Sequence, residues 1–164
     1  MGKITGIWQE LFKYWQEKEG VDIKCVGATQ QQLIELEESI KLKIPEELKE
    51  SLMCCNSYPE DLSKVNSACL YLGNGCMLYD TCTIEEIYLD GIEYGYIEDK
   101  NLIPIFDWNG NIHILICSKT GNIIYSDMEF GIKKVIFSSY AKLLEYVKSV
   151  ILSKGSLSYK DFEI

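Results

Sequence analysis

The chain contains no arginine, because all 16 of its basic residues are lysines. Bidentate recognition of phosphate or guanine needs a guanidinium group, as does an arginine finger, so these devices are not available to this protein. The balance is also acidic, with 25 Asp and Glu residues and a net charge of −9. An acidic surface without arginine is repelled by nucleic acid, and we expect no nucleic-acid partner.

Histidine is almost as scarce, since His113 is the only one. No Ser-His or Cys-His arrangement can be built beyond this residue, and it lies in the middle of an apolar segment, which favours a structural or surface role. Residues 107–111 look like a calcium loop, but Gly110 falls at the fourth position instead of the sixth and no twelfth-position glutamate follows. We therefore expect no catalysis, no metal and no cofactor.

Long apolar runs are also missing. No stretch of about 18 apolar residues occurs, and the charged N-terminal segment lacks the apolar centre of a signal peptide. This pattern predicts a cytoplasmic protein with no membrane contact. Seven cysteines are present, but none has the C-x-x-C spacing of a zinc or redox motif, so we expect reduced, free thiols.

The first third of the chain has the periodicity of helices. Thr5 is a candidate cap for a helix running to about residue 18, and Thr29 with Gln32 forms the capping box of a second helix. Pro45 opens a third helix. From their helical spacing, we expect Leu48, Leu52 and Met53 to point inward in it.

The segment from residue 102 to 128 is predicted to be a three-stranded β-meander. Asn109-Gly110 is a strong type I′ hairpin signal, and a second turn falls at Gly121. Residues 112–117 are apolar on one face and nearly so on the other, so the meander must be covered. Another Asn-Gly hairpin is expected around residues 73–75, and a further strand over 135–137.

Two more helices are expected. Thr83 starts a short one that runs to about Leu89 and is followed by a polar loop to residue 101, and Ser138 or Ser139 caps the last one, which ends at Gly155. Residues 155–164 form a short tail. The order of elements predicts a single α+β domain over 1–164, with an antiparallel curved sheet and N- and C-terminal helices packed on one side.

Two segments resemble the SMI1/KNR4 domain of the SUKH superfamily. The N-terminal signature is matched by Gly27, Thr29, Leu33, Glu37, Ile44-Pro45, Leu48, Leu52 and Asn56, and the later strand and turn by Ile103, Pro104, Ile105, Asp107 and Gly110. The resemblance extends over about 27–152. Ile44 stands where leucine is usual, and Ser57 replaces the glycine that normally follows the asparagine.

The resemblance implies function by binding. Many bacterial members resemble immunity proteins, which neutralise toxins delivered between neighbouring cells, while fungal relatives are regulatory interaction proteins. The first hypothesis is therefore stoichiometric binding of a cognate toxin, possibly a nuclease, by a non-enzymatic protein. The alternatives are a regulatory scaffold for a cell-envelope or signalling partner, and a small enzyme or ligand-binding domain that uses the concave face of the sheet.

One charge feature adds to the binding hypothesis. Residues 61–111 contain nine acidic residues and only two lysines, with tyrosines between them. Acidic and tyrosine side chains on loops suit an interface with a basic partner, although they also keep a domain soluble. The predicted contact residues are Asp80, Glu85, Glu86, Tyr88, Asp90, Glu93, Tyr94, Tyr96, Glu98, Asp99, Asp107 and Trp108.

Overall fold

The computed structural model describes residues 2–19, 25–56, 71–73, 76–108 and 110–163. Three helices come first, α1 (Lys3–Glu19), α2 (Gln30–Ile40) and α3 (Glu46–Cys54). Two short strands, β1 (Tyr71–Gly73) and β2 (Cys76–Leu78), precede α4 (Thr81–Glu93). The remaining elements are β3 (Leu102–Trp108), β4 (Ile112–Cys117), β5 (Ile123–Asp127), β6 (Ile132–Phe137), α5 (Tyr140–Lys154) and a 3₁₀ turn, η3 (Tyr159–Phe162).

The six strands form one antiparallel sheet in the order β1-β2-β3-β4-β5-β6, so the predicted α+β class and meander are confirmed. Leu102 lies opposite Cys117 and Trp108 opposite Ile112, which leaves three residues in the first connection of the meander. Gly110 has a φ of 74° there, while Asn109 lies outside the described residues. The predicted turn at 74–75 also lies outside them.

Residues paired across the strands share a face of the sheet, so the register separates two faces. Ile116 pairs with Ile123, which pairs with Phe137, and the Phe137 ring lies 5.3 Å from that of Tyr146 on α5. We call this the α5 face. Leu115, Ile124 and Val135 pair in the same way on the opposite face, which we call the outer face.

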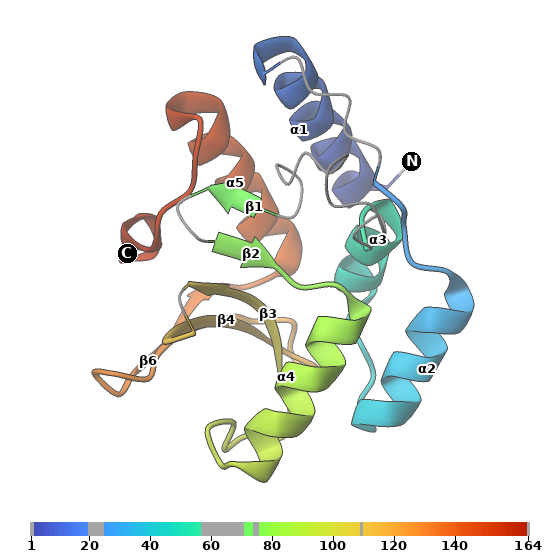
Figure 1. The fold of residues 1–164 in the computed structure, drawn as a ribbon, viewed down its shortest axis with the longest axis vertical. Coiled ribbons are helices and arrows are strands. Elements are labelled where there is room, and N and C mark those ends of the chain that lie inside the picture. The colour runs from blue at the N-terminus through green and yellow to red at the C-terminus, as the bar shows by residue number, and fades with distance from the viewer. Residues whose placement is uncertain (1, 20–24, 57–70, 74–75, 109, 164) are drawn as a thin grey trace.

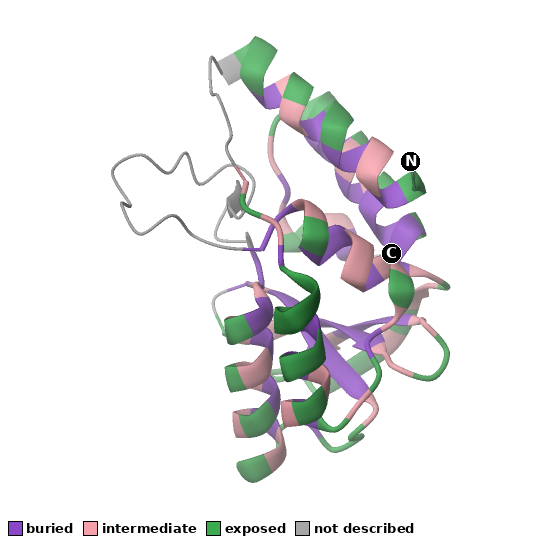
Figure 2. Cartoon of the chain, turned by 90° about the vertical axis from the view of Figure 1, so that its right-hand side faces the viewer, coloured by how far each residue is buried: buried purple, intermediate pink, exposed green. Residues whose placement is uncertain are grey.

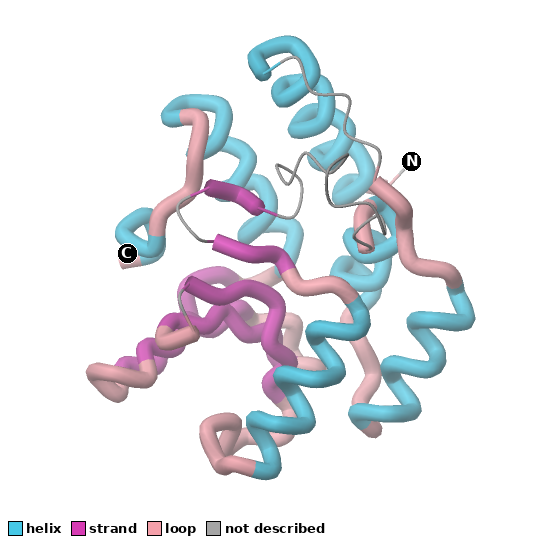
Figure 3. Tube along the Cα trace, viewed as in Figure 1, coloured by secondary structure: helices cyan, strands magenta, loops and turns pink. Residues whose placement is uncertain are grey.

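The helices lie in two groups around the sheet (Figures 1 and 3). Helix α1 contacts α3 and α5 at one end of the molecule, while α2 contacts α4 at the other. Figure 2 shows buried residues along the inner sides of the helices and exposed residues along their outer sides. Inside, Trp8 Nε1 donates to Ser51 Oγ at 2.8 Å, and Ser51 Oγ lies 2.8 Å from Tyr140 Oη, so one buried serine joins three helices.

The C-terminal tail is ordered against the α5 face. Leu157 and Phe162 are fully buried, and the Phe162 ring lies 5.0 Å from that of Trp108. Ser158 and Asp161 form a capping box that starts the 3₁₀ turn, and Tyr146 Oη donates to the Asp161 carbonyl oxygen. The tail therefore completes the core, which the sequence reading left undecided.

Several element boundaries differ from the sequence prediction. Helix α1 begins at Lys3, so Thr5 lies inside it, where its N–H and hydroxyl both donate to Glu50 Oε1. Met53 is 46% exposed and does not point inward, because the buried residues of α3 are Leu48, Ser51 and Leu52. The predicted caps Thr29 and Ser139 and the stop at Gly155 are confirmed.

Helix α4 is longer than predicted. It begins at Thr81 with Asp80 as its cap, because Asp80 Oδ1 accepts the Thr83 N–H at 2.7 Å, and it continues to Glu93. Thr83 is therefore not the cap, and residues 90–93 are helical where the sequence suggested a loop. Among the described residues, no helix is both long and apolar enough to cross a bilayer.

Candidate functional site

The residues that carry the family motif have structural roles, beginning with Gly27. Ala28 N donates to Leu52 O at 2.8 Å and Asn56 N donates to Val26 O at 2.8 Å, so this segment lies flat against the end of α3. A Cβ atom on Gly27 would lie 1.7 Å from Met53 O. Only glycine allows the two backbones to approach this closely.

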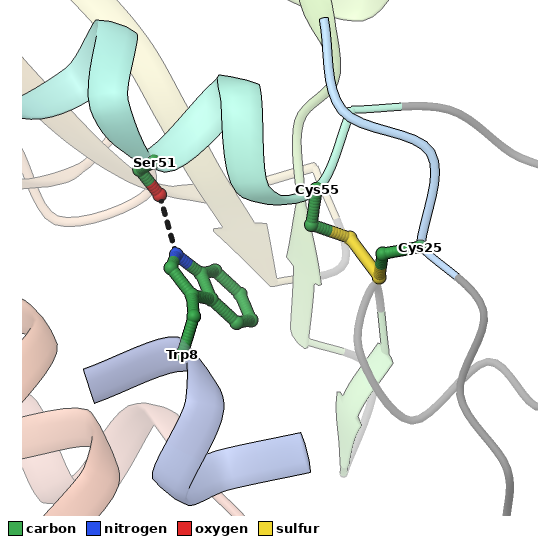
Figure 4. The surroundings of a disulfide bond; sticks show 4 residues. All are labelled: Trp8, Cys25, Ser51 and Cys55. Carbon is green, nitrogen blue, oxygen red and sulfur yellow. Dashed lines mark hydrogen bonds between the residues drawn. A yellow bond between two sulfur atoms is a disulfide. The ribbon is translucent and has the colours of Figure 1, made fainter. Parts of the chain in front are cut away.

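The same approach brings Cys25 and Cys55 together in a disulfide, with Cα atoms 5.0 Å apart (Figure 4). The expectation of free cysteines is wrong for this pair. Thirty residues separate them in sequence, and only the backbone pairing around Gly27 makes them neighbours. Among the described residues, Cys54, Cys82 and Cys117 are free, as expected.

Glu37 closes the turn between α2 and α3. Its Oε1 accepts the Ile44 N–H at 2.8 Å and lies 2.9 Å from Lys49 Nζ, while Oε2 lies 3.1 Å from Lys43 Nζ. Partial burial raises the pKa of Glu37, but hydrogen bonds from Lys49 and the Ile44 N–H outweigh this effect and hold the pKa below its ordinary value. The carboxylate is thus engaged within the fold.

Asn56 joins the end of α3 to the start of α4. Its Oδ1 accepts the Thr81 N–H at 2.8 Å, and its Nδ2 donates to Thr81 Oγ1 at 3.1 Å. Because the side chain is buried, these bonds satisfy polar groups that water cannot reach. The position of α4, and hence of its outer side chains, depends on this contact.

The second motif is also structural. Asp107 Oδ2 accepts the Gly110 N–H at 3.1 Å, and burial raises the pKa of this carboxyl. His113 lies opposite Asp107 on β4, and its Nε2 donates to Gly110 O at 3.0 Å. The Tyr96 ring stacks on the imidazole, with 6.5 Å between the two ring centroids. His113 is 8% exposed, which agrees with the structural role expected of it.

The predicted contact residues divide into buried and exposed groups. Trp108 and Tyr88 are 2% and 5% exposed, so the proposal that they offer their rings to a partner is wrong. Trp108 packs on Phe162, and the Tyr88 hydroxyl donates to Lys100 O at 2.8 Å. Three acids are already engaged, since Asp80 caps α4, Glu85 accepts from Ser39 Oγ, and Asp107 holds its own turn.

The remaining residues form one continuous surface on α4 and the loop after it. Glu86, Asp90 and Glu93 follow one another along the solvent side of the helix at spacings of four and three. Tyr94 is 72% and Tyr96 37% exposed. We call these five residues the acidic face.

The side chain of Tyr96 lies near two of the carboxylates of the acidic face. Burial raises the pKa of the Tyr96 hydroxyl, and the nearby negative charges of Asp90 and Glu86 raise it further. The Tyr96 hydroxyl also donates to Ile87 O at 3.4 Å, which holds the ring beside the helix. Glu98 and Asp99 follow in the same loop, and Asp99 Oδ1 accepts the Asn101 N–H at 2.9 Å.

Leu89 is a feature of this surface that the sequence reading missed. It is 43% exposed and stands between Glu86 and Glu93 on the solvent side of α4. A groove of about 470 Å³ runs beside it between α2 and α4, lined by Ser39, Leu42, Leu89, Ile92 and Glu93 among others. A helical-wheel analysis reveals Leu89, because the buried row of this helix runs through Ile84, Tyr88 and Gly91.

The arrangement has features that protein–protein interfaces use. Exposed carboxylates attract a basic partner, and tyrosine with leucine supplies contact area beside them. No group of three His, Cys, Asp or Glu side chains that could hold a metal ion occurs in the described part of the chain.

The fold is an α+β domain built on an antiparallel meander. Comparison of the sequence with models of known protein families shows which family the chain is related to. Residues 27–146 match the SMI1 / KNR4 family (SUKH-1), which is more than half of the chain. The chain therefore belongs to this family. A search among curated proteins finds no match.

Proposed function

We propose that this chain is an immunity protein that neutralises a toxin by binding it in a stoichiometric complex. The observation that carries the proposal is the acidic face, in which Glu86, Tyr94 and Tyr96 are exposed and Asp90 is half-buried among them. The family-motif residues form the scaffold beneath this surface. Because the motif side chains Glu37, Asn56 and Asp107 are engaged inside the fold, partner recognition falls to surface residues outside the motif.

The proposed mechanism is occlusion and involves no bond chemistry. The carboxylates of the acidic face steer a basic toxin surface into place, as basic surfaces are common in proteins that act on anionic substrates. Tyr94, Tyr96 and Leu89 then provide the apolar contact area. The bound immunity protein covers the substrate site of the toxin or blocks its functional motion.

The proposal predicts that a toxin gene lies beside the gene for this chain, and the test uses the protein which that neighbouring gene encodes. Co-expression should rescue growth, and the purified pair should form a complex on size-exclusion chromatography. Asp90→Lys should weaken the complex at least tenfold, because it replaces an attraction by a repulsion at the centre of the acidic face. The Asp90 side chain is half-buried on α4 and accepts no hydrogen bond among those described, and an unchanged thermal unfolding midpoint of the variant will show that the fold is kept.

Glu17→Lys is the matched control. Glu17 is an exposed acid on α1, and its only described partner is Lys13 at 3.8 Å, so its reversal should leave binding unchanged. Absence of both rescue and complex would reject the immunity function. Rescue that survives Asp90→Lys would retain the function but move the binding site elsewhere.

A further inference from the structure

Strand β6 forms one edge of the sheet. It pairs with β5 along Ile132 to Phe137 and has no second neighbour among the described strands. Every other N–H and C=O group of an edge strand points away from the sheet and can pair with an added strand. Figure 1 shows the β5–β6 hairpin extending from the body of the molecule.

The edge is unusually apolar for a surface strand. Val135 is 61% exposed and Ile132 46% exposed, and Phe130 in the preceding turn is 72% exposed. This turn has a defined shape, because the buried Asp127 accepts the N–H groups of both Glu129 and Phe130 through Oδ1. An ordered edge with exposed apolar side chains is a template for strand addition.

A hollow of about 370 Å³ lies beside the edge on the outer face. Its apolar lining includes Leu102, Ile124 and Val135, and its charged lining includes Asp99, Lys133 and Lys134. Val135 and Ile124 are paired across β5 and β6, so both belong to the outer face. A strand added to β6 places the side chain opposite Val135 at the rim of this hollow.

The charge of β6 is opposite to that of the whole chain. It carries Lys133 and Lys134 and no carboxylate, whereas the net charge of the protein is −9. Two copies paired through β6 would bring four lysines together, and like charges opposed across strands are destabilising. The lysines therefore disfavour a second copy and favour a segment with carboxylates.

We propose that the β6 edge binds an extended acidic segment of a protein partner, which pairs antiparallel to β6. Carboxylates of that segment lie opposite Lys133 and Lys134, and an apolar residue lies opposite Val135. This surface is separate from the acidic face, so the proposal goes beyond the toxin-binding function and does not depend on it.

The test measures binding of a defined peptide to the isotope-labelled full chain. The probe is the capped peptide Thr-Thr-Val-Glu-Glu-Thr-Thr, and Thr-Thr-Val-Lys-Lys-Thr-Thr is the control peptide. The acidic peptide should slow hydrogen exchange at alternate backbone amides of residues 132–137, because every second N–H group of an edge strand points outward and would pair with the added strand. Lys133→Glu should raise its dissociation constant about tenfold, since an attraction becomes a repulsion.

Lys18→Glu is the control variant, because Lys18 is exposed on α1 and should change peptide binding less than twofold. Equal binding of both peptides, or no protection at 132–137 up to millimolar peptide, overturns the proposal. Concentration-dependent protection without peptide, together with a dimer in sedimentation, also overturns it and assigns the edge to contacts between copies. None of these outcomes bears on the acidic face.

Discussion

Replacement of Glu37 tests the structural role of the family motif most directly. Glu37→Ala removes the acceptor of the Ile44 N–H at 2.8 Å and the ion pairs with Lys49 at 2.9 Å and Lys43 at 3.1 Å. Ile44 is 2% exposed, so its N–H has no ready access to water after the substitution. The turn between α2 and α3 then loses the Glu37 contacts, which are the side-chain interactions described for it.

The magnitude follows from these contacts. A hydrogen bond to a charged acceptor contributes about 1.5–3 kcal/mol when one partner is buried. The Lys49 side chain is 17% exposed and its ion pair adds about 1 kcal/mol, while that of Lys43 is 88% exposed and adds little. We expect a loss of about 3 kcal/mol in the free energy of unfolding, or a fall in Tm of about 6–12 °C.

Glu37→Gln separates the two contributions. The glutamine Oε1 still accepts the Ile44 N–H, but it carries no charge for Lys49. The expected loss is therefore about 1 kcal/mol, seen as a smaller shift in the midpoint of urea unfolding. Glu38→Gln serves as a surface control, because Glu38 is an exposed neighbour on α2.

The pH dependence gives a second measurement. The pKa of Glu37 is lowered in the folded state, so its contribution is complete above the unfolded value of about 4.3 and is lost as the pH falls through the folded pKa. The stability gap between the wild type and Glu37→Gln should therefore narrow below about pH 4. If Glu37→Ala loses less than about 0.5 kcal/mol, or the gap widens in acid, the structural role assigned to Glu37 is wrong.

Two further predictions concern the segment around Gly27. Gly27→Ala should destabilise the fold by about 3 kcal/mol in urea unfolding, because its Cβ would meet Met53 O, whereas Gly6→Ala, with open space around it in α1, should be neutral or slightly stabilising. Reduction of the Cys25–Cys55 disulfide, which closes a separation of 30 residues, should lower stability by about 3–4 kcal/mol, and identical unfolding midpoints with and without reductant would contradict this expectation.

Local patterns in the sequence were sufficient for most of the fold. The meander over β3, β4 and β5, the caps at Thr29 and Ser139, and the stop at Gly155 all depend on residues within a few positions of one another. The sequence predicted helix α4 in the right place but ended it too early, near Leu89. The polar residues Asp90 and Glu93 suggested a loop, although they lie on the outer side of the helix.

Only part of the candidate site could be predicted from local patterns in the sequence. The acidic segment was evident from composition, and in the structure Glu86, Tyr94 and Tyr96 are exposed while Asp90 is half-buried near Tyr96. Composition could not show that Tyr88 and Trp108 are buried, because each has a large apolar ring with one polar group, which suits a core as well as an interface. It also could not reveal Leu89 or the groove between α2 and α4, which exist only once two helices pack.

The sequence by itself therefore determined the class of the domain, its family motif and the sign of its surface charge. The class and the family motif follow from the local spacing of residues. The sign of the surface charge follows from the composition, which has more acidic residues than lysines and no arginine. The tertiary structure alone decided the Cys25–Cys55 disulfide, the burial of Trp108 under Phe162, and the open edge at β6. These features join residues far apart in the chain, and the contacts that create them are made only when the core is packed.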